Sequence, residues 1–221
     1  AAPGEVGDVD EAIHAAEESI ALYASFDKAV TEAETTYSSL AGNEGESYKA
    51  LIDQARAKCN AGTATPEEIE RLIAQLAKEG ILYLAANGTG VVPTVTTYNF
   101  VPEGATGALG RLKVSGLSAS KLKYQGFCWA RHNEPTLKDD FTTTGEKLYD
   151  YPGLIYVMEP MEPATEYYVR AFAMTTDNQV GYGQVRRIIT LPMGKCTWHY
   201  AYNGEEADNK RLAAAAEGAM Y

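Results

Sequence analysis

The chain has 221 residues and carries 19 Lys and Arg against 30 Asp and Glu, a formal net charge of −11. Hydrophobic residues at 45% and charged residues at 22% lie near the averages of globular proteins, which excludes a wholly disordered chain. No apolar run approaches the ~20 residues that a transmembrane helix needs. The acidic balance argues against binding to a nucleic-acid backbone, which requires a basic face.

Two parts of the sequence differ in charge and in hydrophobic period. Residues 1–90 hold 6 Lys and Arg against 16 Asp and Glu, whereas residues 91–221 hold 13 against 14. Apolar residues recur at three- and four-residue steps in the first part and alternate in the second. The sequence therefore predicts a helical domain followed by a β domain, with the change near residue 90.

Three amphipathic helices are predicted in the first part, and we expect them to pack as an antiparallel bundle. Asp8 and Glu11 have the spacing of a capping box, and the apolar pattern that follows extends to residue 40 as one long helix or two. The other predicted boundaries are residues 47–60 for the second helix and the Thr65-Pro66-Glu67-Glu68 opening of the third, which ends at residues 87–88.

Six strands are predicted in the second part, separated by turn residues at the spacing of a β-sandwich. In the third of them, Phe127 and Trp129 share one face, while Tyr124, Gly126 and Cys128 share the other. The predicted strands span residues 95–100, 112–115, 122–131, 154–158, 167–173 and 181–191.

Residues 161–173, which read Met-Glu-Pro-Ala-Thr-Glu-Tyr-Tyr-Val-Arg-Ala-Phe-Ala, resemble the E–F corner and F strand of fibronectin type III modules. Gly-Phe-Cys-Trp at 126–129 and Gly-Tyr-Gly at 181–183 resemble the C strand and the start of the G strand in a bacterial version of the module, common in secreted and surface proteins of anaerobic gut bacteria. The resemblance covers residues 91–192 and implies an antiparallel β-sandwich.

The same resemblance assigns structural roles to single residues. Tyr167 becomes the corner tyrosine, whose hydroxyl bonds to nearby backbone. The residues that it implies in the core are Val169, Ala171 and Ala173, and those that it implies on the outer face are Tyr168, Arg170 and Phe172.

Two further resemblances complete the predicted domain order. Residues 1–90, with Ala-Ile-x-x-Ala at 12–16 and Tyr-x-x-Leu-Ile-x-x-Ala at 48–55, are similar to a FIVAR three-helix module of bacterial surface proteins. Residues 193–221 are expected to form a strand and a helix, and resemble the opening of a metzincin-type zinc peptidase domain. The His-Glu-x-x-His zinc motif is absent from the sequence. These resemblances imply export, with a signal peptide already removed.

Candidate binding residues are two groups of aromatic side chains, and the ligand class that suits them is a glycan or a protein. Tyr149 and Tyr151 lie in a predicted loop. Trp198, Tyr200 and Tyr202 share one face of a predicted strand, and the alternative is that these three fill a core beneath the last helix. The residues expected to have a structural role are Tyr167, Trp129 and Phe127.

Neither a catalytic motif nor a metal or cofactor motif is evident in the sequence. Three cysteines without Cys-x-x-Cys spacing indicate buried thiols, with a Cys128–Cys196 bridge as the alternative. His14, Glu17 and Glu18 have helical spacing for a metal, but a lone histidine beside helix-surface glutamates usually forms a solvated face, which is the interpretation preferred here. The prediction is a non-catalytic extracellular or cell-surface module that spaces, adheres or binds, and whose oligomeric state is left open. The alternative is an accessory part of a secreted zinc peptidase or other hydrolase.

Overall fold

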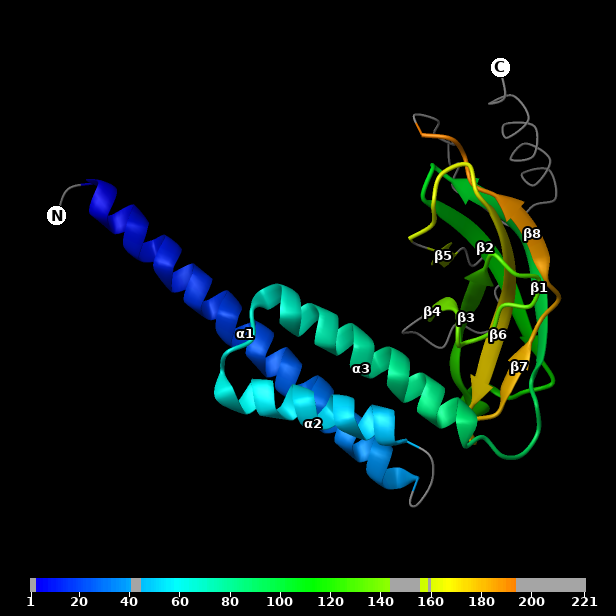
Figure 1. Cartoon of the computed structure of the whole chain (residues 1–221), viewed down its shortest axis with the longest axis horizontal. Coiled ribbons are helices and arrows are strands. Elements are labelled where there is room, and N and C mark those ends of the chain that lie inside the picture. Colours follow the sequence, from blue (N-terminus) through cyan, green and yellow to red (C-terminus); the bar gives the residue numbers. More distant parts are fainter. Residues whose placement is uncertain (1–2, 41–44, 144–155, 159, 194–221) are drawn as a thin grey trace. The chain divides into compact units, whose positions relative to one another are not determined.

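The computed structural model describes residues 3–40, 45–143, 156–158 and 160–193. It confirms the predicted fold class, because three helices precede two antiparallel β-sheets (Figure 1). The chain divides into two units, Ala1–Asn87 and Gly88–Tyr221. None of the described helices has the length and apolar character that a membrane span requires.

The first unit consists of α1 (Pro3–Ser39), α2 (Glu46–Ala61) and α3 (Pro66–Ala86). The predicted capping box at Asp8 and Glu11 is wrong, because α1 begins at Pro3 and both residues lie inside the helix. Proline is favoured at the first helical position, and no glycine or proline interrupts the sequence from Asp8 to the end of the helix. The long apolar pattern is therefore one continuous helix.

The other helix boundaries follow their local signals. α2 ends at Gly62, whose φ of 62° places it in the left-handed region that glycine adopts without strain. α3 begins with the predicted capping box, in which the Glu68 amide donates to Thr65 Oγ1 and the Glu68 carboxylate accepts from the Thr65 amide. These boundaries were predictable because each depends on residues within one helical turn.

The bundle core combines an aliphatic layer with a group of tyrosines. Tyr37, Tyr48 and Tyr83 pack together, with ring centroids 5.4–6.3 Å apart. At the bundle surface, Arg56 of α2 forms ion pairs with Asp27 and Glu34 of α1. The fully buried aliphatic and aromatic members include Phe26, Val30, Ile52, Ile69, Leu72 and Leu76.

The second unit is a two-sheet sandwich in which every strand pair is antiparallel. One sheet has the order β1-β2-β5, and the other has the order β4-β3-β6-β7, with β8 also paired to β6. The strands are β1 (Thr94–Glu103), β2 (Gly107–Ser115), β3 (Leu122–Ala130), β4 (Asp140–Thr143), β5 (Tyr156–Met158), β6 (Glu166–Thr175), β7 (Val180–Tyr182) and β8 (Arg186–Ile189).

The strand predictions need two corrections. The sixth predicted strand, residues 181–191, is divided into β7 and β8, because pairing with β6 is interrupted between Tyr182 and Arg186. In this interruption the Gln184 side chain accepts from the Thr97 amide of β1. Asp140 begins β4, a strand that the sequence did not predict. Both errors arise from contacts between strands, which a single strand pattern does not encode.

The sandwich core lies between the two sheets. Val95, Ala108, Leu112 and Met158 of the first sheet pack against buried residues of the second sheet. Tyr167 lies at the edge of this core, and its Oη accepts from the Glu162 amide at 2.9 Å, which is the geometry of a tyrosine corner. The core residues contributed by the second sheet include Phe127, Trp129, Val169, Ala171 and Ala173.

Candidate functional site

The aromatic residues predicted to bind a ligand lie outside the described part of the chain. This holds for Tyr149 and Tyr151, and for Trp198, Tyr200 and Tyr202. Their roles stay predictions. The candidate site is a different surface, which the sequence did not indicate as a site.

This surface is the outer face of the β4-β3-β6-β7 sheet, and we call it the outer face. The strand register places residues of four strands in cross-strand rows, with Phe141, Cys128 and Arg170 in one row and Gly126, Phe172 and Tyr182 in the next. Side chains that point away from a sandwich core are usually polar. Here aromatic, sulfur and guanidinium groups alternate instead.

Phe172 has the outward orientation that the resemblance implies, although the strand pattern did not indicate how deeply it is buried. It points away from the sandwich core but is fully buried, and the ring of Phe141 meets it edge to face at a centroid distance of 6.0 Å. Cys128 and Met174, on the same face, are also fully buried. The outer face therefore has an apolar layer of its own, beneath the half-buried Tyr124, Phe141 and Tyr182.

The loop between β3 and β4 closes over Cys128. Cys128 Sγ lies 3.5 Å from the Pro135 carbonyl oxygen and 3.6 Å from that of Arg170, and donates to both. Burial raises the pKa of this thiol to about 12, so the thiolate is not formed near neutral pH. Cys128 is a free cysteine, and Cys196, its partner in the alternative of a bridge, lies outside the described residues. Its role here is that of a small buried group.

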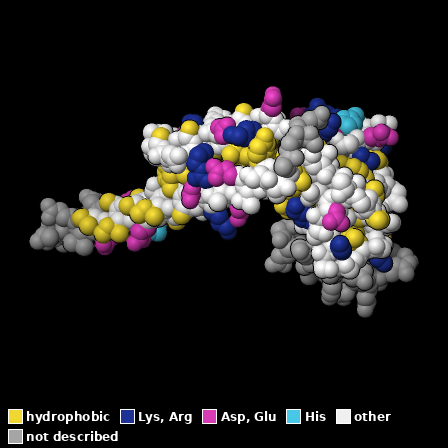
Figure 2. All heavy atoms as spheres, turned by 90° about the horizontal axis from the view of Figure 1, so that it is seen from below, with side chains coloured by type: hydrophobic (Ala, Val, Ile, Leu, Met, Phe, Trp, Pro, Cys, Tyr) yellow, Lys and Arg dark blue, Asp and Glu magenta, His cyan; other side chains and the backbone are white. Residues whose placement is uncertain are grey.

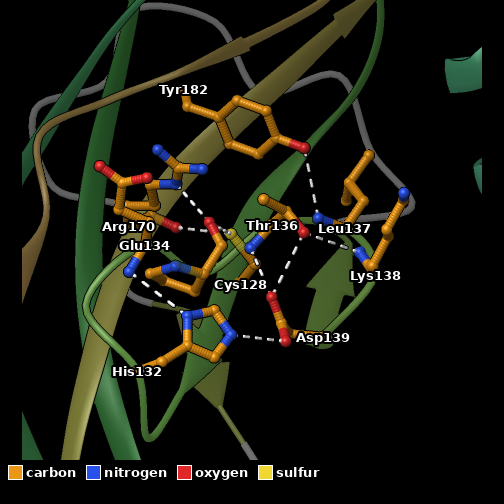
Figure 3. A network of polar contacts seen from close by, with 10 residues as sticks. Cys128, His132, Glu134, Thr136, Leu137, Lys138, Asp139, Arg170 and Tyr182 are labelled. Atoms are coloured by element: carbon orange, nitrogen blue, oxygen red, sulfur yellow. Dashed lines mark hydrogen bonds and ion pairs between the residues drawn. The ribbon is translucent and has the colours of Figure 1, made fainter.

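Arg170 connects the loop to the sheet. Its Nε donates to the Pro135 carbonyl, and its guanidinium lies over the Tyr182 ring, 4.1 Å from the centroid (Figure 3). Tyr182 Oη in turn accepts from the Leu137 amide at 3.2 Å. Burial raises the pKa of Tyr182, an effect that the bond from Leu137 only partly offsets, so the phenol stays protonated. These contacts fix the loop on the strands beneath it.

Asp139 organises the exposed side of the same loop. One carboxylate oxygen accepts from the Thr136 amide at 2.7 Å, and the other lies 2.9 Å from His132 Nε2. Because His132 Nδ1 accepts from the Glu134 amide, Nε2 carries the proton and donates to Asp139. Burial alone would raise the pKa of Asp139, but the bonds from His132 and Thr136 outweigh it and hold that pKa below its ordinary value.

The described residues of this loop do not form a nucleophilic triad. A nucleophilic triad requires a hydroxyl or thiol beside the histidine, but Thr136 Oγ1 bonds to Asp139 and Cys128 is enclosed. Within the described ranges no group of three or more His, Cys, Asp or Glu residues has a metal-binding arrangement. His14 lies within those ranges, and its Nε2 is 3.3 Å from Glu18 Oε1. The outer face thus offers aromatic and charged groups in fixed positions.

Three comparisons with known proteins complete the description. None of the protein-family models matches the chain, and neither does any curated protein. Among solved structures, a fibronectin type III domain of human fibronectin type III domain containing protein 3 is 18% identical over 47% of this chain and 91% of that chain, with a TM-score of 0.34. The sixth such domain of the same protein is 18% identical over 52% and 99%, with a TM-score of 0.34.

A bacterial structure is similar at the same level. The sensor domain of the anti-sigma factor RsgI4 of Pseudobacteroides cellulosolvens is 12% identical over 48% of this chain and 100% of that chain, with a TM-score of 0.32. The assignment of the fold rests on the strand order and on the Tyr167 corner. The sandwich is therefore fibronectin type III-like in architecture.

Proposed function

We propose that the chain is a non-catalytic module, presented outside the cell, whose sandwich binds a protein ligand through the outer face and the loop between β3 and β4. The observation that carries this proposal is the Arg170–Tyr182 stack, which holds an aromatic and cationic surface beneath a loop fixed by hydrogen bonds. Export is supported by the sequence resemblance to bacterial surface modules.

The composition of the outer face suits a protein partner. Tyrosine and arginine are the residue types that most often dominate the binding energy of protein interfaces. The loop is already ordered by Asp139, so little conformational entropy is lost when it contacts a ligand. The exposed side chains of His132 and Lys138 lie on this loop, where a partner meets them first.

A protein suits this surface better than a glycan. Sugar rings stack on bare aromatic faces, but one face of the Tyr182 ring is covered by Arg170 and the Phe172 ring is fully buried. The groups that remain accessible are the charged groups of the loop and the half-buried side chains of Tyr124, Phe141, Arg170 and Tyr182. A surface of this mixed kind is typical of a protein interface with an apolar centre and a polar rim.

The test uses matched charge reversals on the two sheets. Lys138→Glu changes the loop, and Lys113→Glu changes an equally exposed lysine of β2 on the other sheet. The labelled 221-residue chain is applied to secreted and surface proteins of the producing cells and, separately, to a glycan array. We expect protein binding that Lys138→Glu weakens at least tenfold and Lys113→Glu leaves unchanged. Equal loss in both variants, or binding to glycans alone, would contradict the proposal.

The wider organisation is part of the same proposal. We assign residues 1–90 to a spacer bundle, residues 91–192 to the binding sandwich, and residues 193–221 to the start of a third domain. The alternative role, an accessory segment of a secreted zinc peptidase, concerns residues outside the described part. Reading the coding sequence after Tyr221 tests it, since the peptidase role requires His-Glu-x-x-His within the following domain.

A further inference from the structure

The N-terminal part of α1 exposes an apolar stripe that the bundle does not use. Every residue from Val9 to Ala21 is exposed, and the side chains of Val9, Ile13 and Ile20 are 56%, 52% and 71% accessible. Figure 2 shows hydrophobic side chains in a row along this projecting helix, with acidic side chains beside them. Large aliphatic groups exposed together on one helix face are typical of an interaction surface.

The spacing of the stripe is that of a coiled coil. Val9, Ile13, Ala16, Ile20 and Tyr23 follow one another at steps of four and three residues, which is the heptad pattern of two core positions. Isoleucine occupies the same heptad position at 13 and 20, where β-branched residues favour two-stranded coils. The stripe therefore has the geometry to receive one further helix.

This stripe is distinct from the face of α1 that packs in the bundle. Phe26 and Val30 are fully buried against α2 and α3. At 100° per residue, Phe26 lies about 120° around the helix from Ile20. Tyr23, at the C-terminal end of the heptad run, is half-buried and packs on the bundle core, whereas the apolar residues that precede it in the run are exposed. The bundle therefore leaves the part of the run before Tyr23 uncovered.

The charged residues beside the stripe indicate which kind of partner helix it can bind. Asp10 and Glu17 line one edge, while the opposite edge carries the uncharged Ala12 and Ser19. The first Lys or Arg of the chain is Lys28, so residues 1–27 contain acidic groups and no Lys or Arg to balance them. A second copy would add acidic charge to this segment, whereas lysines or arginines on a partner would complement Asp10 and Glu17.

We propose that Val9–Ile20 of α1 binds a basic amphipathic helix of another protein as a two-stranded coiled coil. The partner helix places its apolar residues against Val9, Ile13, Ala16 and Ile20, and its lysines or arginines beside Asp10 and Glu17. This interface is separate from the outer face of the sandwich and rests on a different observation.

The experiment uses the full 221-residue chain and a synthetic peptide of about three heptads, with isoleucine and leucine at its core positions and lysine at the flanking positions. Binding is measured by calorimetry. We expect the double variant Ile13→Ser/Ile20→Ser to weaken binding at least tenfold. Asp10→Lys/Glu17→Lys should weaken binding of the lysine peptide to a similar extent. This variant should instead bind a peptide with glutamate at the flanking positions.

The matched control reverses the same number of charges on the far side of the helix. Glu11 and Glu18 lie on the side away from the stripe, so Glu11→Lys/Glu18→Lys should change binding of the lysine peptide less than threefold. Equal loss with both charge-reversed pairs would show non-specific attraction and overturn the proposal. So would absence of binding, or sedimentation of the wild-type chain as a dimer that Ile13→Ser/Ile20→Ser dissociates, which would make a second copy the occupant.

Discussion

The tyrosines of the helical unit and those of the sandwich stabilise opposite kinds of backbone group. In the bundle, Tyr83 and Tyr23 donate their hydroxyl protons to carbonyl oxygens. In the sandwich, the hydroxyls of Tyr167 and Tyr182 accept from backbone amides. A phenol can do both, so the surrounding structure decides which of its two capacities is used.

Whether a tyrosine hydroxyl donates or accepts follows from which backbone groups each fold leaves without a partner. The last carbonyls of a helix have no partner within it, and Tyr83 Oη lies 2.9 Å from the Leu40 carbonyl oxygen just beyond α1. Loops that leave a sheet expose amides instead, as with Glu162 at the corner and Leu137 in the loop between β3 and β4. Tyrosine thus closes the C-terminal end of a helix in one unit and the turns of a sandwich in the other.

The largest effect in this comparison is expected at Tyr83, which stacks on both Tyr37 and Tyr48. Tyr83→Ala should destabilise the bundle by about 3–5 kcal/mol, the range for removing a buried aromatic ring. Tyr83→Phe keeps the ring and removes only the donor, and should cost about 1 kcal/mol. Urea unfolding with hydrogen exchange of the α3 amides measures both. Equal losses in the two variants would mean that the hydroxyl, not the ring, carries the effect.

Tyr167→Phe should have the next largest effect, about 1–3 kcal/mol, because it leaves the Glu162 amide without its acceptor at a buried corner. Hydrogen exchange of the Glu162 amide is expected to accelerate together with that of β6. Tyr168→Phe, one residue further along the strand on the outer side, is the matched control and should change stability much less. Slow exchange at Glu162 in Tyr167→Phe would contradict the assigned role of the corner.

Tyr182→Phe should cost about 0.5–1.5 kcal/mol and act mainly on the loop. The ring stays under Arg170, so the sheet keeps its packing, while the Leu137 amide loses its acceptor. Leu137 is buried, and its exchange should accelerate before that of β3. If the loop orders the binding surface, this variant should also weaken ligand binding without unfolding the sandwich. Unchanged exchange at Leu137 would disprove the anchoring role of the hydroxyl.

These contacts show which parts of the structure were predictable from sequence. The Tyr167 corner joins residues five apart, and the α3 capping box joins residues three apart, so each is a local motif with a fixed spacing. Local signals also compete with one another. Asp8 and Glu11 match a capping box, but Pro3 supplies an earlier start and the helix uses it.

The outer face was not predictable in the same way. Alternation along β3 placed Cys128 on the face opposite Phe127 and Trp129. The resemblance placed Arg170 of β6 on the outer face. Only the register, which pairs Cys128 with Arg170 and Phe172 with Tyr182, brings them into one cluster. Register depends on packing between distant segments, and β4, which contributes Phe141, has only four residues. Because register depends on distant segments, the sequence pattern of β6 alone could not predict that Phe172 is buried.

The smallest predicted effect is a local loss of stability in acid. It is expected at only one of the two ends of the loop between β3 and β4. The pKa of Asp139 in the folded chain lies below its ordinary value of 3.8, so its bonds to His132 and Thr136 stabilise the loop above that pH. This contribution is lost as the pH falls through the lower, folded value. The Tyr182–Leu137 bond does not titrate in that range, because burial raises the pKa of Tyr182.

Acid should therefore loosen the Asp139 end of the loop while the Tyr182 end stays bonded. After correction for intrinsic exchange rates, the Thr136 amide is expected to lose its protection below about pH 4, while the Leu137 amide stays protected. Asp139→Asn should lower the protection of Thr136 at neutral pH and remove its dependence on acid, and the neighbouring Asp140→Asn is the control. Loss of protection at Thr136 and Leu137 together would show that the loop opens as a single unit, with neither anchor acting alone.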